Sequence, residues 1–202
     1  MKTIALAFLI LVPSSAVAQT RPTLAAAAGA GLDVEPARDV AGHGTLTSTQ
    51  GSFEFEGEVL WSEVGLLARG VGTNGSSDYR AGGFDRLELM VGGSWRPLAL
   101  RANGYGWVRM VARRLSVEGG LAYQRLIAGL DDANTLGLHI GFHGDLPLVA
   151  EEGGKIPFVR VIAQRSFILA GDTISVTNRT FSGRIDPGTP ALQVLFALGV
   201  SW

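Results

Sequence analysis

The sequence predicts an all-β fold, namely a closed, antiparallel, up-and-down transmembrane β-barrel of eight strands. Apolar and polar residues alternate with a period of two in eight separate segments, which is typical of strands with two different faces. Hydrophobic residues make up 47% of the chain and charged residues only 17%, whereas soluble domains carry about 25% charged residues. No run of 18 apolar residues follows residue 19, so this chain would have to cross a membrane with strands.

The first 18 residues have the three parts of a secretory signal peptide. Lys2 precedes an apolar run from Ile4 to Val12, and a small-residue triplet ends at Ala18. An apolar helix of that length would measure about 14 Å, roughly half of a bilayer core. We therefore expect cleavage before Gln19 and a single domain over residues 19–202. The chain has no Cys, which excludes disulfides, thiolate zinc sites and lipid attachment at a new N-terminal Cys.

The predicted strands follow the alternation in chain order. In one of them, Leu115 and Val117 share the apolar side, while Ser116 and Glu118 share the opposite side. Turn signals separate the segments, for example at residues 96–97, 131–134 and 151–154. The eight predicted ranges are 24–34, 53–61, 85–95, 98–111, 115–124, 136–145, 156–165 and 192–202.

The strand count has one alternative. The apolar positions change from odd to even numbers near Ser62-Glu63, which indicates either a β-bulge or a turn. If this is a turn, and if residues 173–181 form a further strand, the barrel has ten strands. We expect eight.

A soluble periplasmic β-barrel binding protein would show the same alternation with its apolar side inward. The polar sides here contain many Gly, Ala and Ser residues, and Lys155 is the only Lys after residue 18. Because water-facing strand surfaces are normally dense in charge, this composition favours a barrel whose apolar side faces lipid. Trp61, Trp95, Tyr123 and Trp202 fall near predicted strand ends, where interfacial aromatic girdles lie.

If the apolar side faces lipid, the charged strand residues point into the barrel. The interior of an eight-stranded barrel is just wide enough for side chains, so acids and bases there have to pair. We therefore expect a filled lumen rather than a wide pore. The predicted lumen charge network comprises Glu54, Glu56, Glu58, Arg86, Glu88, Arg101, Arg109, Glu118 and Arg160.

A cleavable signal, alternating strands and a final strand that ends in an aromatic residue together resemble the small outer-membrane β-barrel superfamily of Gram-negative bacteria, of the OmpX, OmpW and OmpA membrane-domain type. The resemblance covers the whole mature chain through its pattern. It implies that the last strand, with Leu198, Val200 and Trp202 on one face, is an assembly signal read by the barrel-assembly machinery. The family signal usually has a polar residue and then Gly upstream, where this chain has Leu195 and Ala197.

Two motifs invite a cofactor or metal interpretation. Gly70, Gly72 and Gly75 spell G-x-G-x-x-G, but the helical pattern that a nucleotide-binding turn requires does not follow. His139 and His143 are four strand residues apart, about 13 Å, so one ion cannot be held by both. We expect two histidines in a polar lumen, no metal and no cofactor.

Catalysis has a comparably weak basis. His143 and Asp145 share a strand face and could form a hydrogen-bonded pair. Some relatives in the resembled superfamily modify lipid A with Ser and His, and Ser166 could join such a set, but no motif of those enzymes is present. We expect no enzymatic activity.

The function predicted from these observations is that of an outer-membrane β-barrel with a structural or surface-interaction role. Residues 35–52 and 167–190 are the predicted extracellular loops, because long connections of such barrels face outward. The alternatives are a narrow channel for small or apolar solutes, a lipid A-modifying enzyme and the soluble binding protein. The expected partners are outer-membrane lipid, lipopolysaccharide and the barrel-assembly machinery. A net charge of -1 with no basic stripe argues against nucleic-acid binding.

Overall fold

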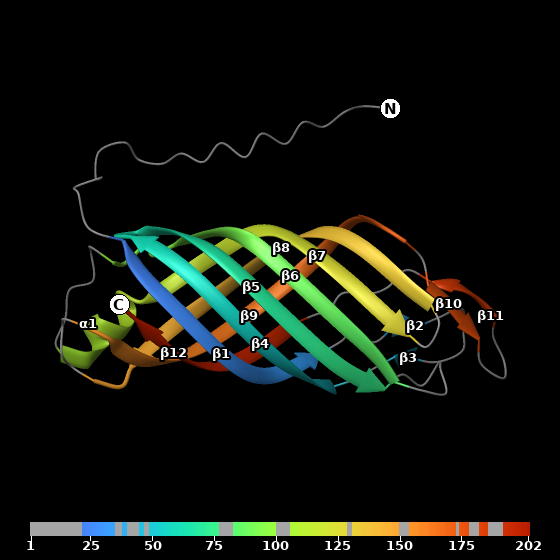
Figure 1. Cartoon of the computed structure of the whole chain (residues 1–202), viewed down its shortest axis with the longest axis horizontal. Coiled ribbons are helices and arrows are strands. Elements are labelled where there is room, and N and C mark those ends of the chain that lie inside the picture. Colours follow the sequence, from blue (N-terminus) through green and yellow to red (C-terminus); the bar gives the residue numbers. More distant parts are fainter. Residues whose placement is uncertain are drawn as a thin grey trace, which may run out of the picture.

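The alternating segments form a closed barrel in the computed structural model of the chain (Figure 1). Eight strands pair in the closed order β1-β12-β9-β8-β7-β6-β5-β4, and all of the neighbouring pairs are antiparallel. They are β1 (Thr23–Val34), β4 (Thr49–Trp61), β5 (Val64–Ser76), β6 (Gly83–Trp95), β7 (Leu115–Ala128), β8 (Asp131–Pro147), β9 (Ile156–Gly171) and β12 (Leu192–Ser201). The predicted eight-stranded up-and-down barrel is confirmed.

The structure describes residues 22–34, 38–39, 45–46, 49–76, 83–99, 106–128, 131–149, 154–172, 174–177, 182–185 and 192–202. The predicted signal peptide, residues 1–18, lies outside these ranges. No helix in the described ranges is long and apolar enough to cross a membrane.

A two-residue turn at Ser62-Glu63 joins β4 to β5, which settles the change of parity seen in the sequence. Ser62 adopts a positive φ of 53°, a conformation that tight turns require. Trp61 pairs with Val64 across the turn, so outward positions pass from odd to even numbers at that point. Residues 64–76 therefore form a strand of the barrel that the sequence assigns only as an alternative.

The prediction of a strand over residues 98–111 is wrong. Residues 97–99 form a turn, and Gly106–Ala112 form the helix α1, which begins at a Gly with a φ of 51°. A short segment with apolar residues at 107, 108, 110 and 111 satisfies both the period of a strand and the period of a helix, so its periodicity does not distinguish them. The added strand β5 and the lost strand compensate, which is why the count remains eight.

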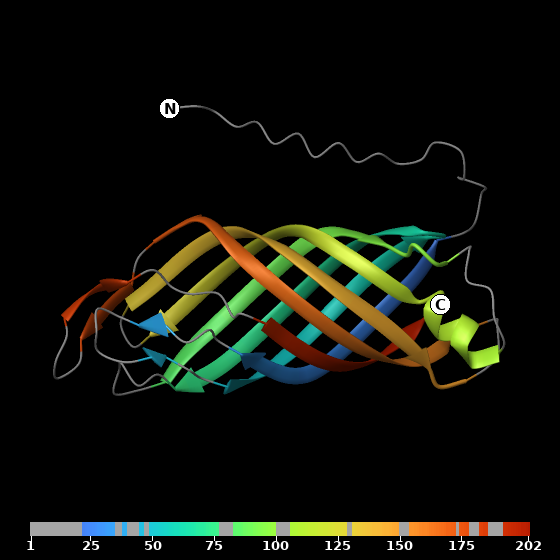
Figure 2. The same ribbon diagram turned by 180° about the vertical axis from the view of Figure 1, so that it is seen from behind.

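The two ends of the barrel differ. The helix α1 and the C-terminus lie at one end, together with the start of β1 (Figures 1 and 2). At the other end lie the small sheets β2-β3, from Arg38–Asp39 and Thr45–Leu46, and β10-β11, from Ile174–Thr177 and Ser182–Ile185. The ten-strand alternative is wrong because β10 pairs with β11 in a separate hairpin instead of entering the barrel. Residues 131–134, predicted as a turn, instead begin β8.

The barrel is polar inside and apolar outside. Among the described residues, 22 polar or charged residues are buried, against 13 buried hydrophobic residues. Large hydrophobic residues cover the outer surface, as in Leu66, Val91 and Leu198, each of which is more than 60% exposed. The alternation therefore places apolar side chains outward, the reverse of a water-soluble barrel.

Two glycines of β5 lie beneath phenylalanine rings of β4. Phe53 pairs with Gly72, and Phe55 pairs with Gly70. A Cβ built on Gly70 would lie 2.3 Å from Cζ of Phe55, and one on Gly72 would lie 2.1 Å from Cζ of Phe53. The G-x-G-x-x-G motif thus lies in a strand, where its first two glycines give the rings room to lie flat on the sheet, an arrangement used to protect glycines in strands.

Candidate functional site

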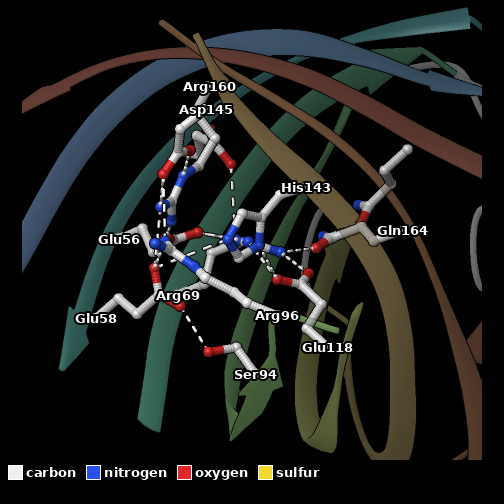
Figure 3. Close-up of polar contacts among 12 residues, drawn as sticks. Glu56, Glu58, Arg69, Ser94, Arg96, Glu118, His143, Asp145, Arg160 and Gln164 are labelled. Carbon is white, nitrogen blue, oxygen red and sulfur yellow. Dashed lines mark hydrogen bonds and ion pairs between the residues drawn. The ribbon is translucent and has the colours of Figure 1, made fainter. Parts of the chain in front are cut away.

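The barrel interior contains a network of charged side chains, because every second residue of each strand points inward. In β4 these are Glu54, Glu56 and Glu58, all buried. Buried partners come from β5, β8 and β9, which also present alternate residues inward. Figure 3 shows how these side chains converge from different walls of the barrel.

Arg160 of β9 is the centre of the part nearest α1. Its Nε donates to Oδ1 of Asp145 at 2.6 Å, and its Nη2 donates to Oδ2 of Asp145 at 2.8 Å and to Oε2 of Glu58 at 2.9 Å. Its Nη1 bonds to Glu56. The guanidinium also lies over the ring of Phe158, 5.1 Å from the centroid. Three carboxylates and a ring therefore surround one fully buried arginine.

Arg69 of β5 is the second centre (Figure 3). Its Nε donates to Oε2 of Glu56 at 2.7 Å, and its Nη2 donates to Oε2 of Glu118 at 2.9 Å. Its Nη1 bonds to Gln164, and Oε2 of Glu54 lies 3.9 Å from Nε. Because Glu56 contacts both arginines, the two centres form one connected network.

His143 and Arg96 add further contacts between the network and neighbouring strands. Nδ1 of His143 lies 2.9 Å from Oε2 of Glu118, and its Nε2 lies 3.7 Å from Oε2 of Glu58. Nη2 of Arg96 lies 3.3 Å from Oδ2 of Asp145 and 3.5 Å from Glu58. The predicted His143–Asp145 pair is thus replaced by contacts of His143 with the two glutamates.

A second polar layer lies toward the end that holds β10 and β11. Oδ1 of Asp33 accepts from Ser52 at 2.6 Å, and Oδ2 accepts from Thr73 at 2.7 Å. Glu88 bonds to Ser166. The two layers are joined through glutamines, because Nε2 of Gln164 donates to Gln193 at 2.6 Å, and Gln193 in turn contacts Asp33 and Glu88.

Some of these contacts span the full width of the lumen. β5 and β9 lie four places apart in a ring of eight strands, yet Arg69 and Gln164 bond directly. β6 and β12 are likewise opposite, and Glu88 contacts Gln193 between them. Side chains from opposite walls that touch leave no continuous wide opening at these levels.

The structure places most of the predicted network residues inside the lumen. The buried ones are Glu54, Glu56, Glu58, Arg86, Glu88, Glu118 and Arg160. Arg109 is a correction, because it lies exposed on α1 rather than on a strand. Arg101 lies outside the described residues.

Four charged residues of the network are absent from the set predicted from the sequence. Arg69 lies on the glycine-rich strand whose apolar side is too broken to indicate a strand, although the parity change at residue 62 was a usable signal. Asp33 and Asp145 stand at inward positions of predicted strands and could have been included. Arg96 follows β6 directly, beyond the reach of the alternation.

The catalytic and metal interpretations also meet specific placements. His139 and Ser166 are register partners of β8 and β9 and are both buried inside the barrel. Ser166 bonds to Glu88 rather than to a histidine. In the described ranges, no group of three or more His, Cys, Asp or Glu residues is arranged to hold a metal ion.

The predicted assembly signal lies on the outer surface of the closing strand. Leu198 and Trp202 are exposed, and Val200 shares their outward side. Trp202 also takes part in barrel closure, because its backbone N–H and C=O exchange two hydrogen bonds of 2.9 Å with Leu24.

No protein-family model matches this chain, and no curated protein sequence matches it. Among solved structures, the chain is similar to Neisserial surface protein A, with a TM-score of 0.45 and 8% identity over 89% of this chain and 94% of the other. It is also similar to in-vitro folded OmpT, an outer membrane protein of Vibrio cholerae, with a TM-score of 0.36 and 15% identity over 89% of this chain and 51% of the other.

Proposed function

We propose that this chain is an outer-membrane β-barrel protein with a structural or surface-interaction role and a closed lumen. The observation that carries the proposal is the reversed distribution of side chains, apolar outside and charged inside. In lipid every backbone polar group needs an internal partner, and a closed ring of eight strands provides one for each.

The positions of the aromatic residues support a membrane setting. Trp61, Trp95 and Trp202 are all exposed and stand at strand ends on the side of α1, where Trp107 is exposed as well. Tryptophans gather in this way at a membrane–water interface. At the other end of the barrel, exposed polar pairs such as Arg125 with Asp132 lie where the apolar outer surface ends.

The interior supports a structural role over a channel. Hydrogen bonds connect opposite walls at two levels, and buried ion pairs lie beside them, so a solute would have to separate these groups to pass. The work of the protein would then be done at its ends, and the hairpin β10-β11 projects beyond the barrel on the side away from α1 (Figure 1). We place that end outside the cell, because long connections of such barrels face outward.

Four measurements test this proposal. The protein should fractionate with the outer membrane, start at Gln19, and migrate faster on gels when unheated than when boiled, as closed barrels do. In a planar bilayer it should give no steady conductance. Recovery in the soluble periplasm would contradict the membrane assignment, whereas regular single-channel openings would contradict only the closed lumen.

A further inference from the structure

A pocket of about 720 Å³ lies at the barrel mouth beneath α1. Its inner side is formed by barrel residues such as Ala25, Leu60 and Ile156, and its outer side by Trp107 and Met110 of the helix. The network around Arg160 and Asp145 forms its inner limit, since Asp145 belongs to both. The pocket therefore borders the lumen network at Asp145.

The charges around the pocket are strongly unbalanced. Four arginines line it, Arg96, Arg109, Arg113 and Arg114, and Asp145 is the one acid among the lining residues. Of the four, Arg96 already contacts Asp145 and Glu58. Both carboxylate oxygens of Asp145 already accept hydrogen bonds from Arg160. The buried residues of the barrel interior include more acids than arginines. The excess of arginines is therefore confined to this mouth.

Two of these arginines have no acidic partner among the described residues. Arg109 and Arg113 stand one helical turn apart, joined by the backbone hydrogen bond from Arg113 N to Arg109 O at 3.1 Å, so their side chains leave the same side of the helix. In the part of the chain that the structure describes, neither forms an ion pair, and Nε of Arg113 is buried with no hydrogen-bond partner. Like charges at this spacing repel each other, and a bound anion would relieve that repulsion.

We propose that this pocket binds a phosphate-bearing ligand that also has an apolar part. The planar guanidinium groups of several arginines match the oxygens of a phosphate, which bears more charge and more acceptors than one carboxylate. Leu60, Met110 and Ile156 offer an apolar wall beside them. The shared chemistry fits the headgroup region of an anionic phospholipid or a soluble organic phosphate, and this inference goes beyond the structural role proposed above.

The test uses the full mature chain folded in zwitterionic detergent, with binding followed by titration calorimetry. The soluble probe is phenyl phosphate, compared with uncharged phenol. The lipid probe is dihexanoyl phosphatidylglycerol, compared with dihexanoyl phosphatidylcholine. We expect saturable binding of at least one of the two anionic probes and none of phenol. Saturation by the phosphatidylglycerol alone would identify a lipid ligand, and saturation by phenyl phosphate alone a soluble one.

The discriminating variant is Arg109→Gln/Arg113→Gln, since neither residue belongs to the lumen network. We expect its affinity to fall at least about tenfold, the loss that goes with removing one charge-assisted hydrogen bond. The matched control Arg125→Gln/Arg165→Gln removes the same charge from exposed positions outside the pocket and should bind as the parent does. Unheated gel mobility verifies that each variant is folded. Non-saturable binding, or an equal loss in both variants, would overturn the proposal.

Discussion

Buried arginines connect the carboxylates of the barrel interior. Arg160 has no exposed surface and contacts three carboxylates. Removing the arginine takes a hydrogen-bond partner from each of these buried carboxylates at once. An exposed arginine on the same molecule has no such effect, and Arg109 on α1 offers that comparison.

Arg160→Leu should therefore lower the free energy of unfolding by about 3–5 kcal/mol, because Asp145 and Glu58 each lose a buried, charged partner. Arg109→Leu should change it by no more than about 0.5 kcal/mol. Urea titration of the protein in lipid vesicles, followed by unheated gel mobility, measures both. Equal effects of the two substitutions would mean that the lumen network contributes little to stability.

Substitutions of leucines on the outer surface test whether lipid or water surrounds the barrel. Leu121 is 57% exposed at the middle of β7, and Leu115 is 44% exposed at its end. In a membrane, Leu121→Arg should cost about 2–4 kcal/mol and Leu115→Arg about 0–1 kcal/mol, since the penalty depends on depth. Folding titrations in vesicles give both values. In water both positions would tolerate arginine, so two neutral results would remove the basis for a lipid-facing surface.

At the scale of the strands, β4 and β5 are matched through rings and glycines. A Cβ at Gly70 would lie 2.3 Å from the ring of Phe55, whereas a Cβ at Gly57 would meet nothing within 4 Å. Gly70→Ala should thus cost about 1–3 kcal/mol through overpacking, and Gly57→Ala should be neutral or slightly stabilising.

The double variant Gly70→Ala/Phe55→Ala separates overpacking from other effects. If the ring is the obstacle, the two substitutions should be non-additive, with the alanine at position 70 costing less once the ring is absent. The same urea titration is applied to the parent protein, Gly70→Ala, Phe55→Ala and the double variant. Additive costs would show that the backbone of β5, rather than the Phe55 ring, requires glycine.

The closing strand β12 allows a further prediction about assembly. Deleting Trp202 removes two backbone hydrogen bonds with Leu24, which together contribute about 1–3 kcal/mol. Trp202→Ala keeps those bonds and should reduce the yield of folded barrel less. Deletion of Gly188, in the predicted loop 167–190, should reduce it least. Quantifying unheated barrel in the outer-membrane fraction ranks the three variants, and an equal yield from all would refute a role for the chain terminus.

These elements also show what the sequence could and could not predict. Seven of the strands follow from strict alternation, because one face of each strand points into the charged lumen and the other face does not. The strand β5 does not follow from alternation, because Gly70 and Gly72 remove two outward apolar positions, and only pairing with β4 shows that rings cover them. Arg69 was missed for the same reason. The error at residues 98–111 and at Arg109 arises because a helix of seven residues is too short for periodicity to identify.

On the scale of the whole molecule, the two ends of the barrel have different chemistry. One end gathers the exposed tryptophans, α1 and the arginine-lined pocket. The other carries the hairpin β10-β11 and exposed polar pairs. Between them, the lumen network separates the two ends.

Closure of the barrel by β1 and β12 has a consequence for biogenesis. Ala26 pairs with Val200, so β1 acquires its second neighbour only when β12 has been made. Until then β1 and β9 both present open hydrogen-bonding edges, which are templates for aggregation. Pairing across such a sequence separation is also intrinsically slow. Both edges therefore stay open to pairing with other chains until β12 fills the gap between them.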